Sequence, residues 1–533
     1  MTQLHMFDSF LVYIIYNNLP LSGDHFTGLT MVIAEPNAVE AWLFDASSFR
    51  DLYMSDDSSS SEDEDDPPRQ RQKRKHKSVY SVADRTTSLF YEKYLSEKAV
   101  ENGIKDEGSF LGKKFRRRFR VPYCLFEDIC RDIMMEGFYR HGKSDASGSE
   151  AVQIELLVLG SLRIMGSGCT FDAIEELTNV SEETHRVFFH NKFCAWGDRV
   201  FPEHVHQPKT EEEIKNVLAL YERIGLPGCG GSVDCVHLVW DKCMAGAASA
   251  CVGKEGFPTL AFEVSSDHTK RILSCSQYFW GSINDKTISL MDPVFDAFRK
   301  PDGMYTNYSW TTSYFDDNNN NNTSNTNDSN TSSRLSKLKL RKPLFKKHTG
   351  LYLICDGGYH KWPCMMNPYH VQIPGTKEER WSTCVESARK DVECVFGILK
   401  KRFLILKHPI RIHDPCRIER IFRTCCVLHN LLLDFDGFTD WNWSEEDVSV
   451  EYTVLEESAR LRAVAKKANV TAGARSAHRS EYDIENDEEG DIAEAMENVE
   501  GGEAADNDDY QTRRLDLMAH HQKMFATRSI KRK

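Results

Sequence analysis

The sequence predicts an α/β layer fold with a mixed sheet and flanking helices, preceded by an all-helical segment. Helical periodicity dominates residues 88–205, whereas apolar strands and amphipathic helices alternate over residues 227–433. An Asn-rich stretch at residues 316–333 interrupts the second segment and should loop out of it. Residues 1–87 contain acidic and basic runs, and residues 440–533 become polar and then acidic, so we expect both termini to be largely disordered.

Composition argues against a disulfide-stabilised secreted protein and against a membrane protein. The chain has 533 residues and a hydrophobic content of 40%, which is enough for two or three domains with a sizeable core. Its 16 cysteines lie scattered in apolar runs such as "RTCCVLHN", so we expect reduced thiols in an intracellular compartment and no disulfide scaffold. The N-terminal run "FLVYIIY" is too short to span a bilayer, so we expect no membrane association.

The charge is unevenly distributed along the chain. Residues 481–509 hold 14 acidic side chains and no Lys or Arg, which equals the whole formal net charge of −14 and leaves the rest of the chain formally neutral. Basic residues gather at 69–77 ("RQRQKRKHK") and 113–120 ("KKFRRRFR"). The first run is typical of a nuclear-import signal, and its alternatives are a solvated charge run or a nonspecific nucleic-acid patch. We therefore expect a nuclear protein.

The helical segment contains the elements of a helix-turn-helix. A long helix, "AVQIELLVLGSLRIM", is followed by the short helix "TFDAIEELT", a tight turn and "SEETHRVFFHNKFCAWG", for which Ser181 is the expected N-cap. In such a motif the last helix enters the DNA major groove. The candidate DNA contacts on it are Arg186, His190, Asn191 and Lys192. The alternative is a three-helix bundle with an ordinary polar face, which Glu182 and Glu183 favour.

The second segment carries the acidic residues of interest. "GGSVDCVHLVW" predicts a buried strand with Asp234 in its middle, and "PTLAFEVSSD" with "RILSCSQYFWGS" predicts a hairpin. "NDKTISLMDPVFDAFRK" predicts an amphipathic helix, and "LYLIC" predicts a fourth strand that leads into Asp356. If the first and fourth strands are neighbours, the two aspartates approach each other and require a proton or a divalent cation, for which Mg²⁺ or Mn²⁺ is suited.

A helix at residues 385–403 supplies a third carboxylate. Its apolar positions form one stripe, and Glu393 lies at the border of that stripe, from which it can reach the sheet edge. Glu386 is nearly in line but two turns (~10 Å) closer to the helix start. Arg389 and Lys400 flank the same face and are candidates for phosphate contact. The alternative is that Glu393 is an ordinary surface residue paired with Lys or Arg at helical spacing.

Five motifs, in this order, resemble the signatures of Harbinger (PIF/Harbinger) transposases and the nucleases derived from them. They are "GGSVDCVHLVW", "GSINDKTI", "CDGGYHKW", "ESARKDVECVFGILKKRF" and "TCCVLHN". The resemblance covers residues 88–433. It implies a ribonuclease-H-like fold with a catalytic, metal-binding triad of Asp234, Asp356 and Glu393, which decides against Glu386. Asp285 belongs to a family signature outside the triad, and we interpret it as the N-cap of the helix that it opens.

The resemblance also implies a function and partners. The expected activity is that of a DDE-type DNA endonuclease and transposase that uses two Mg²⁺ or Mn²⁺ ions, cleaves transposon ends and joins them to target DNA. The expected partners are DNA, a Myb-like accessory protein and further copies of the chain on DNA. One alternative is a domesticated nuclear scaffold that binds DNA or chromatin without catalysis, and another is a ribonuclease. We interpret His429 and Asn430 as buried structure, whereas His237 and His360 could either pack or orient a ligand.

Overall fold

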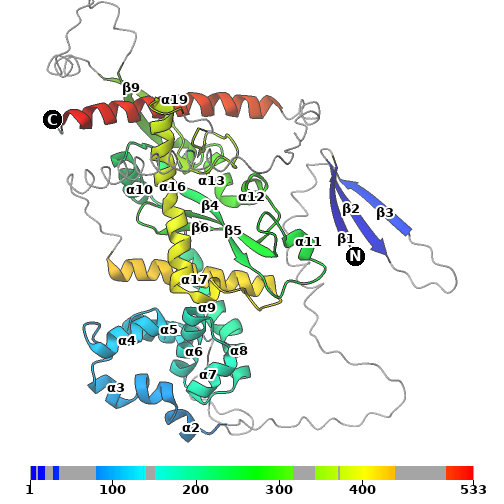
Figure 1. The fold of residues 1–533 in the computed structure, drawn as a ribbon, viewed down its shortest axis with the longest axis vertical. Coiled ribbons are helices and arrows are strands. Elements are labelled where there is room, and N and C mark those ends of the chain that lie inside the picture. The colour runs from blue at the N-terminus through cyan, green and yellow to red at the C-terminus, as the bar shows by residue number, and fades with distance from the viewer. Residues whose placement is uncertain are drawn as a thin grey trace, which may run out of the picture. The chain divides into compact units, whose positions relative to one another are not determined.

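The computed structural model describes most of the chain between residues 80 and 437 and a C-terminal helix (Figure 1). The described residues are 2–7, 10–17, 28–34, 80–135, 137, 139, 151–315, 343–369, 373–437 and 500–531. The acidic linker, the basic run at 69–77 and the Asn-rich insertion lie outside them. The chain divides into two compact units, one made of residues 1–75 and 483–500, the other of residues 76–482 and 501–533.

The first unit contains an antiparallel sheet that the sequence analysis does not predict. Its strands pair in the order β1-β2-β3. They are β1 (Thr2–Phe7), β2 (Phe10–Asn17) and β3 (Gly28–Ala34).

The second unit begins with the predicted helical segment. Its α-helices are α2 (Val82–Thr86), α3 (Glu97–Glu101), α4 (Phe110–Phe119), α5 (Tyr123–Met135), α6 (Ile154–Ser167), α7 (Phe171–Thr178), α8 (Glu182–Phe188) and α9 (Cys194–His204). Two π-helical turns, η2 (Tyr91–Leu95) and η3 (Phe189–Phe193), interrupt this series. Ser181 caps α8 by accepting a hydrogen bond from the backbone N–H of Thr184, as predicted. Helix α10 (Glu211–Arg223) then leads to the sheet.

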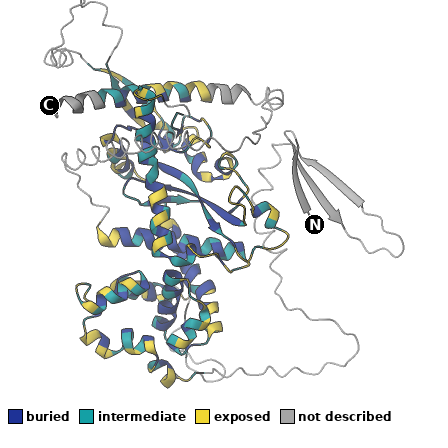
Figure 2. Cartoon of the chain, in the orientation of Figure 1, coloured by how far each residue is buried: buried dark blue, intermediate teal, exposed yellow. Residues whose placement is uncertain are grey.

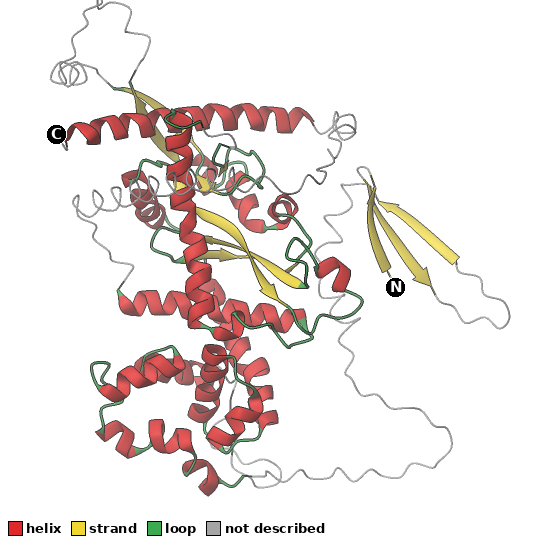
Figure 3. Ribbon diagram, viewed as in Figure 1, coloured by secondary structure: helices red, strands yellow, loops and turns green. Residues whose placement is uncertain are grey.

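A mixed sheet forms the centre of the second unit, which confirms the predicted α/β layer (Figure 3). Its strand order is β11-β10-β4-β5-β6, and β7 also pairs with β5. The strands are β4 (Cys229–Val239), β5 (Thr259–Ser266), β6 (Ile272–Cys275), β7 (Phe279–Trp280), β10 (Tyr352–Ile354) and β11 (Met365–Met366). Strand β4 is antiparallel to β5 but parallel to β10, so the first and fourth predicted strands are neighbours. A separate ribbon, β8 (Ser309–Tyr314) and β9 (Leu344–Thr349), flanks the Asn-rich insertion.

The predicted helix over "NDKTISLMDPVFDAFRK" is two helices. They are α12 (Asp285–Met291) and α13 (Pro293–Arg299), with the short α11 (Ala248–Cys251) before them and α14 (Met304–Asn307) after them. The break occurs at Asp292, whose side chain caps α13 while Pro293 occupies its first position, because proline removes the N–H that a continuous helix would need. The prediction that Asp285 is the N-cap of α12 is wrong. Asn284 has that role, since its side-chain oxygen accepts the N–H of Thr287 at 2.8 Å.

One long helix, α16 (Lys377–Arg402), runs across the sheet, and α17 (Pro415–Asp436) follows it after the short 3₁₀ turn η5 (Leu404–Leu406) (Figure 1). The predicted apolar stripe of α16 is confirmed, because Val385, Val392 and Leu399 are buried. Apolar residues of the helical segment, the sheet and α17 belong to one hydrophobic cluster. Figure 2 shows the central strands as largely buried. The helical segment and the sheet therefore share a core.

The last helix, α19 (Glu500–Lys531), lies in the C-terminal region for which disorder is predicted, so the structure differs from that prediction at these residues. Its Tyr510, Leu517 and Met518 are buried in a second hydrophobic cluster on the β10 side of the sheet. Arg513 donates hydrogen bonds to the backbone carbonyls of Gly350 and Pro363. This helix is thus packed onto the α/β layer. None of the described helices combines the length and the apolar character needed to cross a membrane.

Candidate active site

The pairing of β10 with β4 brings Asp234 and Asp356 to the same edge of the sheet. The two strands are parallel, and Ile354 pairs with Ser232. Each aspartate follows its member of that pair by two residues, and neighbouring strands are about 4.8 Å apart, so the two carboxylates occupy adjacent positions. Asp234 still lies within β4, whereas Asp356 stands just beyond the end of β10. The predicted convergence of these two residues is therefore present in the fold.

Burial and acidic neighbours disfavour the charged form of Asp234. They raise its pKa from 3.8 to about 6, mainly through burial and further through the charges of Asp356 and Asp285. Two contacts oppose this shift. The Arg389 guanidinium lies 2.9 Å from one carboxylate oxygen of Asp234, and the backbone N–H of Cys235 donates to the other at 2.9 Å. With a pKa of about 6, Asp234 is partly protonated near neutral pH, and a further cation beside it would favour the ionised form.

Asp356 and Asp285 face each other across a glycine. The Oδ1 atom of Asp356 accepts the backbone N–H of Gly358 at 2.7 Å. A Cβ atom at Gly358 would lie only 3.0 Å from this oxygen and 3.4 Å from Oδ2 of Asp285. A side chain at this position would therefore press on both carboxylates, which glycine leaves room for. Asp285 is a fourth acidic residue at the site, and the signature "SIND" was the only sequence signal that pointed to it.

Glu393 reaches the site through a salt bridge. Arg389, one turn earlier on α16, contacts Asp234 with one terminal nitrogen and Glu393 with the other, the latter at 2.8 Å. One guanidinium group thus bridges the carboxylates of Asp234 and Glu393. The Glu393 side chain is 43% exposed, whereas that of Arg389 is 16% exposed. The pairing of Glu393 with an Arg at helical spacing is present, but the same Arg also ties it to the strand-borne aspartate.

This arrangement is an acidic cluster joined by an arginine. Within the described parts of the chain, no three His, Cys, Asp or Glu side chains stand close enough together to hold a metal ion as they are placed. The donor set nevertheless has the chemistry that Mg²⁺ requires, since Asp234, Asp356 and Glu393 offer only carboxylate oxygens. Arg389 lies between two of these donors, so a cation could join Asp234 to Glu393 only after the guanidinium moved.

A second pair of carboxyls is buried next to the site, and the sequence analysis missed it. Glu263 on β5 is 1% exposed, and burial together with Asp292 raises its pKa well above the usual range. Burial also raises the pKa of Asp292, so a proton on one of these two neighbouring carboxyls is favoured. The hydroxyl of Tyr359 lies 3.6 Å from the Cys235 sulfur in the same region. A proton on Glu263 lowers the negative charge of this buried pair from two to one.

Other residues proposed from the sequence have structural partners. The Lys400 ammonium donates to the backbone carbonyl of His237 at 3.1 Å, and burial lowers its pKa. The His237 ring forms a 3.0 Å hydrogen bond with the Thr259 hydroxyl, and the His360 ring stacks on Trp362 at 4.5 Å. His429 and Asn430 are fully buried, as predicted. They hold the β5–β6 turn, since Asn430 donates to the carbonyl of Ile272 and accepts its N–H.

The candidates on the helical segment differ in exposure. His190 is buried between aromatic rings, including that of Phe189 at 5.0 Å, and burial lowers its pKa to about 4. It cannot contact DNA in this structure, so the prediction for this residue is wrong. Arg186 is exposed but pairs with Glu183 at 2.6 Å. Asn191 is exposed and Lys192 is half-buried.

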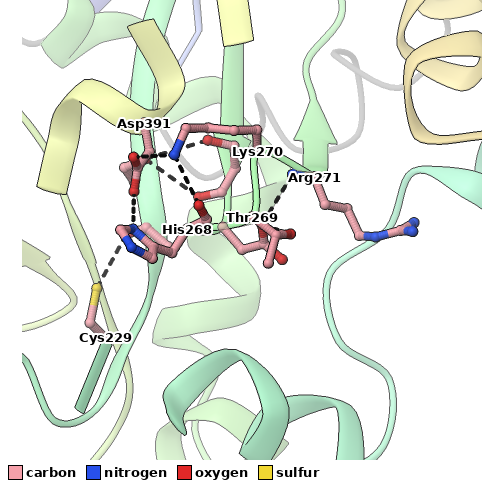
Figure 4. Close-up of polar contacts among 10 residues, drawn as sticks. Cys229, His268, Thr269, Lys270, Arg271 and Asp391 are labelled. Carbon is pink, nitrogen blue, oxygen red and sulfur yellow. Dashed lines mark hydrogen bonds and ion pairs between the residues drawn. The ribbon is translucent and has the colours of Figure 1, made fainter. Parts of the chain in front are cut away.

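A buried polar cluster ties α16 to the β5–β6 turn (Figure 4). Asp391 lies two residues before Glu393, but its side chain is only 8% exposed. One of its oxygens contacts Nδ1 of His268 and the other contacts the Lys270 ammonium, both at 2.6 Å. Figure 4 shows the Cys229 thiol pointing toward the His268 ring. Burial raises the pKa of this thiol beyond its ordinary range, so the cluster holds elements together and contains no reactive thiolate.

Comparison with known proteins yields two matches that include this site. Residues 203–318 and 304–440 match the family described as "Plant transposon protein". A protein named "Protein ALP1-like" from Arabidopsis thaliana is 23% identical over 337 residues, which cover 62% of this chain and 73% of that protein. No solved structure matches. The first family match contains Asp234 and Asp285, and the second contains Asp356 and Glu393.

Proposed function

Because this chain belongs to the Harbinger-derived, DDE-type family, we propose that it is a metal-dependent DNA endonuclease and transposase. It would cleave phosphodiester bonds at transposon ends and join the freed 3′-hydroxyl groups to target DNA. The observation that supports this best is the parallel pairing of β10 with β4, which makes Asp234 and Asp356 neighbours while α16 brings Glu393 to the same edge. We also propose a ribonuclease-H-like fold for residues 227–433.

In this proposal the metal ligands are Asp234, Asp356 and Glu393, and the ions are two Mg²⁺ or Mn²⁺. When bound, such ions activate the attacking hydroxyl and stabilise the leaving oxygen. Asp285, which faces Asp356 across Gly358, is a further candidate donor. The chain's own residues prepare the site: the Cys235 N–H and the Arg389 guanidinium favour the ionised form of Asp234. Once displaced from Glu393, Arg389 would be free to contact a phosphate of the DNA.

A second function is favoured by one specific contact. The bridge from Arg389 to Asp234 and Glu393 gives both carboxylates a cationic partner without a metal ion. A domesticated chain that only bound DNA or chromatin would be stable with this bridge in place. The two functions differ in whether a divalent cation can displace Arg389. A ribonuclease acting on RNA–DNA hybrids is a third function for the same acidic site, and a hybrid substrate would test it.

Cleavage by the purified full-length chain tests the proposal. The substrates are a supercoiled plasmid and, where inverted repeats are found beside the gene, DNA that ends in those repeats, each with Mg²⁺ or Mn²⁺. We expect nicking by the parent protein and none by Asp234→Asn or Glu393→Gln, with DNA binding retained. Glu386→Gln is the matched control, since it makes the same change two turns away on the same helix and should nick normally. If parent and variants bind DNA alike and none cuts with either metal, the scaffold function is correct.

We propose further that the protein acts in the nucleus, with DNA as substrate. The proposal includes assembly of several copies on DNA and a Myb-like accessory protein that recognises the terminal repeats. Arg186, Lys192 and Arg389 are the proposed DNA contacts from the sequence. Lys400 is a weaker candidate, because its ammonium is bound to the β4 backbone.

A further inference from the structure

A basic groove lies between the helical segment and the C-terminal ends of α16 and α17. It has a volume of about 540 Å³. Its lining residues are Lys113, Arg116, Arg117, Arg120, Ile398, Lys401, Arg402 and Leu432. Six of these eight are Lys or Arg, and they come from two helices, α4 and α16, that are far apart in the sequence. We call this set the basic groove.

Helix periodicity explains how α4 presents its cations. Phe115 and Phe119 are fully buried in the shared core, so the opposite face of α4 carries the basic side chains at spacings of three and four residues. Arg120 ends the helix in a left-handed conformation with φ of 67°. The run "KKFRRRFR" is therefore one basic stripe on the outside of a buried aromatic row.

The charges of the basic groove are only partly neutralised. Arg116 pairs with Glu107 at 3.2 Å and with Asp436 at 2.6 Å. The guanidinium of Arg402 donates to Nδ1 of His429 at 3.1 Å, an uncharged acceptor.

Three further cations of the groove are Lys113, Arg117 and Lys401. All three are exposed, and none of them has a carboxylate partner among the described residues. Like charges that lie close together repel each other. Burial lowers the pKa of Arg402 most, and the neighbouring charges of Arg116 and Arg120 lower it further. The groove thus contains an excess of positive charge that a polyanion would stabilise.

We propose that the basic groove binds the phosphate backbone of duplex DNA beside the stretch that meets the acidic cluster of the same helix, with the duplex passing around α16 between the two. Glu393 and Lys401 are eight residues apart on α16, which is about 12 Å along the helix axis. That span equals three to four nucleotides of one strand of B-DNA, at about 3.4 Å per phosphate. The groove would position DNA without reading its sequence, because it offers charge and no base-specific contacts. The proposal rests on the proposed function for the identity of the polyanion.

Charge reversal tests the groove without requiring cleavage. The double variant Arg117→Glu/Lys401→Glu is compared with Lys98→Glu/Lys215→Glu, which makes the same net charge change at exposed positions outside the groove. Binding of the full-length protein to a labelled 30-bp duplex is measured by fluorescence anisotropy in EDTA at several salt concentrations. We expect the groove variant to bind the duplex ~10-fold more weakly or worse, and the control to bind like the parent. The slope of log K against log[salt] should be about 2 less negative for the groove variant than for the parent.

Two results would overturn this inference. One is an equal loss of affinity in the groove variant and the control, which would mean that only net charge matters. The other is unchanged duplex binding by the groove variant together with loss of thermal stabilisation by inositol hexakisphosphate, which would assign the groove to a small polyphosphate. Melting temperatures equal to that of the parent exclude misfolding of the variants. Because binding is measured in EDTA, where no cleavage can occur, failure of the nuclease proposal and failure of the groove are distinguishable.

Discussion

Asp391 and Glu393 stand two residues apart on α16, yet they differ in burial and role. Asp391 is 8% exposed and contacts His268 and Lys270, so it ties the helix to the β5–β6 turn. Glu393 is 43% exposed and pairs with Arg389, which also reaches Asp234. At 100° per residue the two side chains point about 160° apart around the helix axis. The buried ion pair of Asp391 with Lys270 therefore stabilises the fold. The half-exposed pair of Glu393 with Arg389 lies at the sheet edge, where another cation can replace the guanidinium.

Removing the buried carboxylate should have the largest effect. Asp391→Asn leaves the Lys270 ammonium without its counter-charge, so we expect a loss of about 3 kcal/mol in the free energy of unfolding. Urea denaturation followed by tryptophan fluorescence measures it. A loss below about 1 kcal/mol would show that Asp391 is no more structural than Glu393, and the comparison would fail.

The next effect concerns Asp234 and depends on pH. Its pKa in the folded chain is about 6, raised from 3.8, so the native state binds a proton more tightly than the unfolded state and this group costs stability as pH rises between those values. Asp234→Asn should therefore gain about 1–3 kcal/mol over the parent above pH 7 and nothing near pH 3. Unfolding curves at both pH values check this. An equal effect at the two pH values would place the pKa of Asp234 near its ordinary value.

A smaller effect is expected on metal affinity. Arg389→Gln removes the guanidinium that competes for Asp234 and Glu393, so Mn²⁺ should bind about 3- to 10-fold more tightly, as expected for loss of an ion pair worth about 1 kcal/mol. Electron paramagnetic resonance of free Mn²⁺ measures the affinity. Lys390→Gln, which changes the next residue, is the control. If both variants bind Mn²⁺ like the parent, Arg389 does not occupy the cation site.

The smallest effect should be that of Glu393→Gln on stability. Its i,i+4 pair with Arg389 is half-exposed, so we expect a change within about 0.5 kcal/mol in the free energy of unfolding. The same urea assay measures it beside Asp391→Asn. A loss as large as that of the Asp391 variant would mean that Glu393 belongs to the packed structure and that its activity cannot be tested by substitution.

The sequence alone determined the strands and the helix that carry the three candidate carboxylates, and their order along the chain. Apolar runs and helical periodicity predicted the strands that carry Asp234 and Asp356 and the stripe of α16, and local capping chemistry predicted Ser181 as an N-cap. These features depend on residues within one or two turns of each other. They are therefore readable from spacing, whereas the adjacency of the two aspartates stayed conditional until the pairing of β10 with β4 established it.

The tertiary structure alone decided which charged group faces which. It showed Asn284 instead of Asp285 at the N-cap, His190 in the core, and Arg389 between Asp234 and Glu393. It also brought the α4 cations beside the end of α16, some 280 residues later in the chain. Burial and charge pairing depend on distances between distant segments, and a side chain two positions away on one helix can meet an entirely different environment. For that reason spacing predicted where carboxylates occur, but only packing assigned their partners.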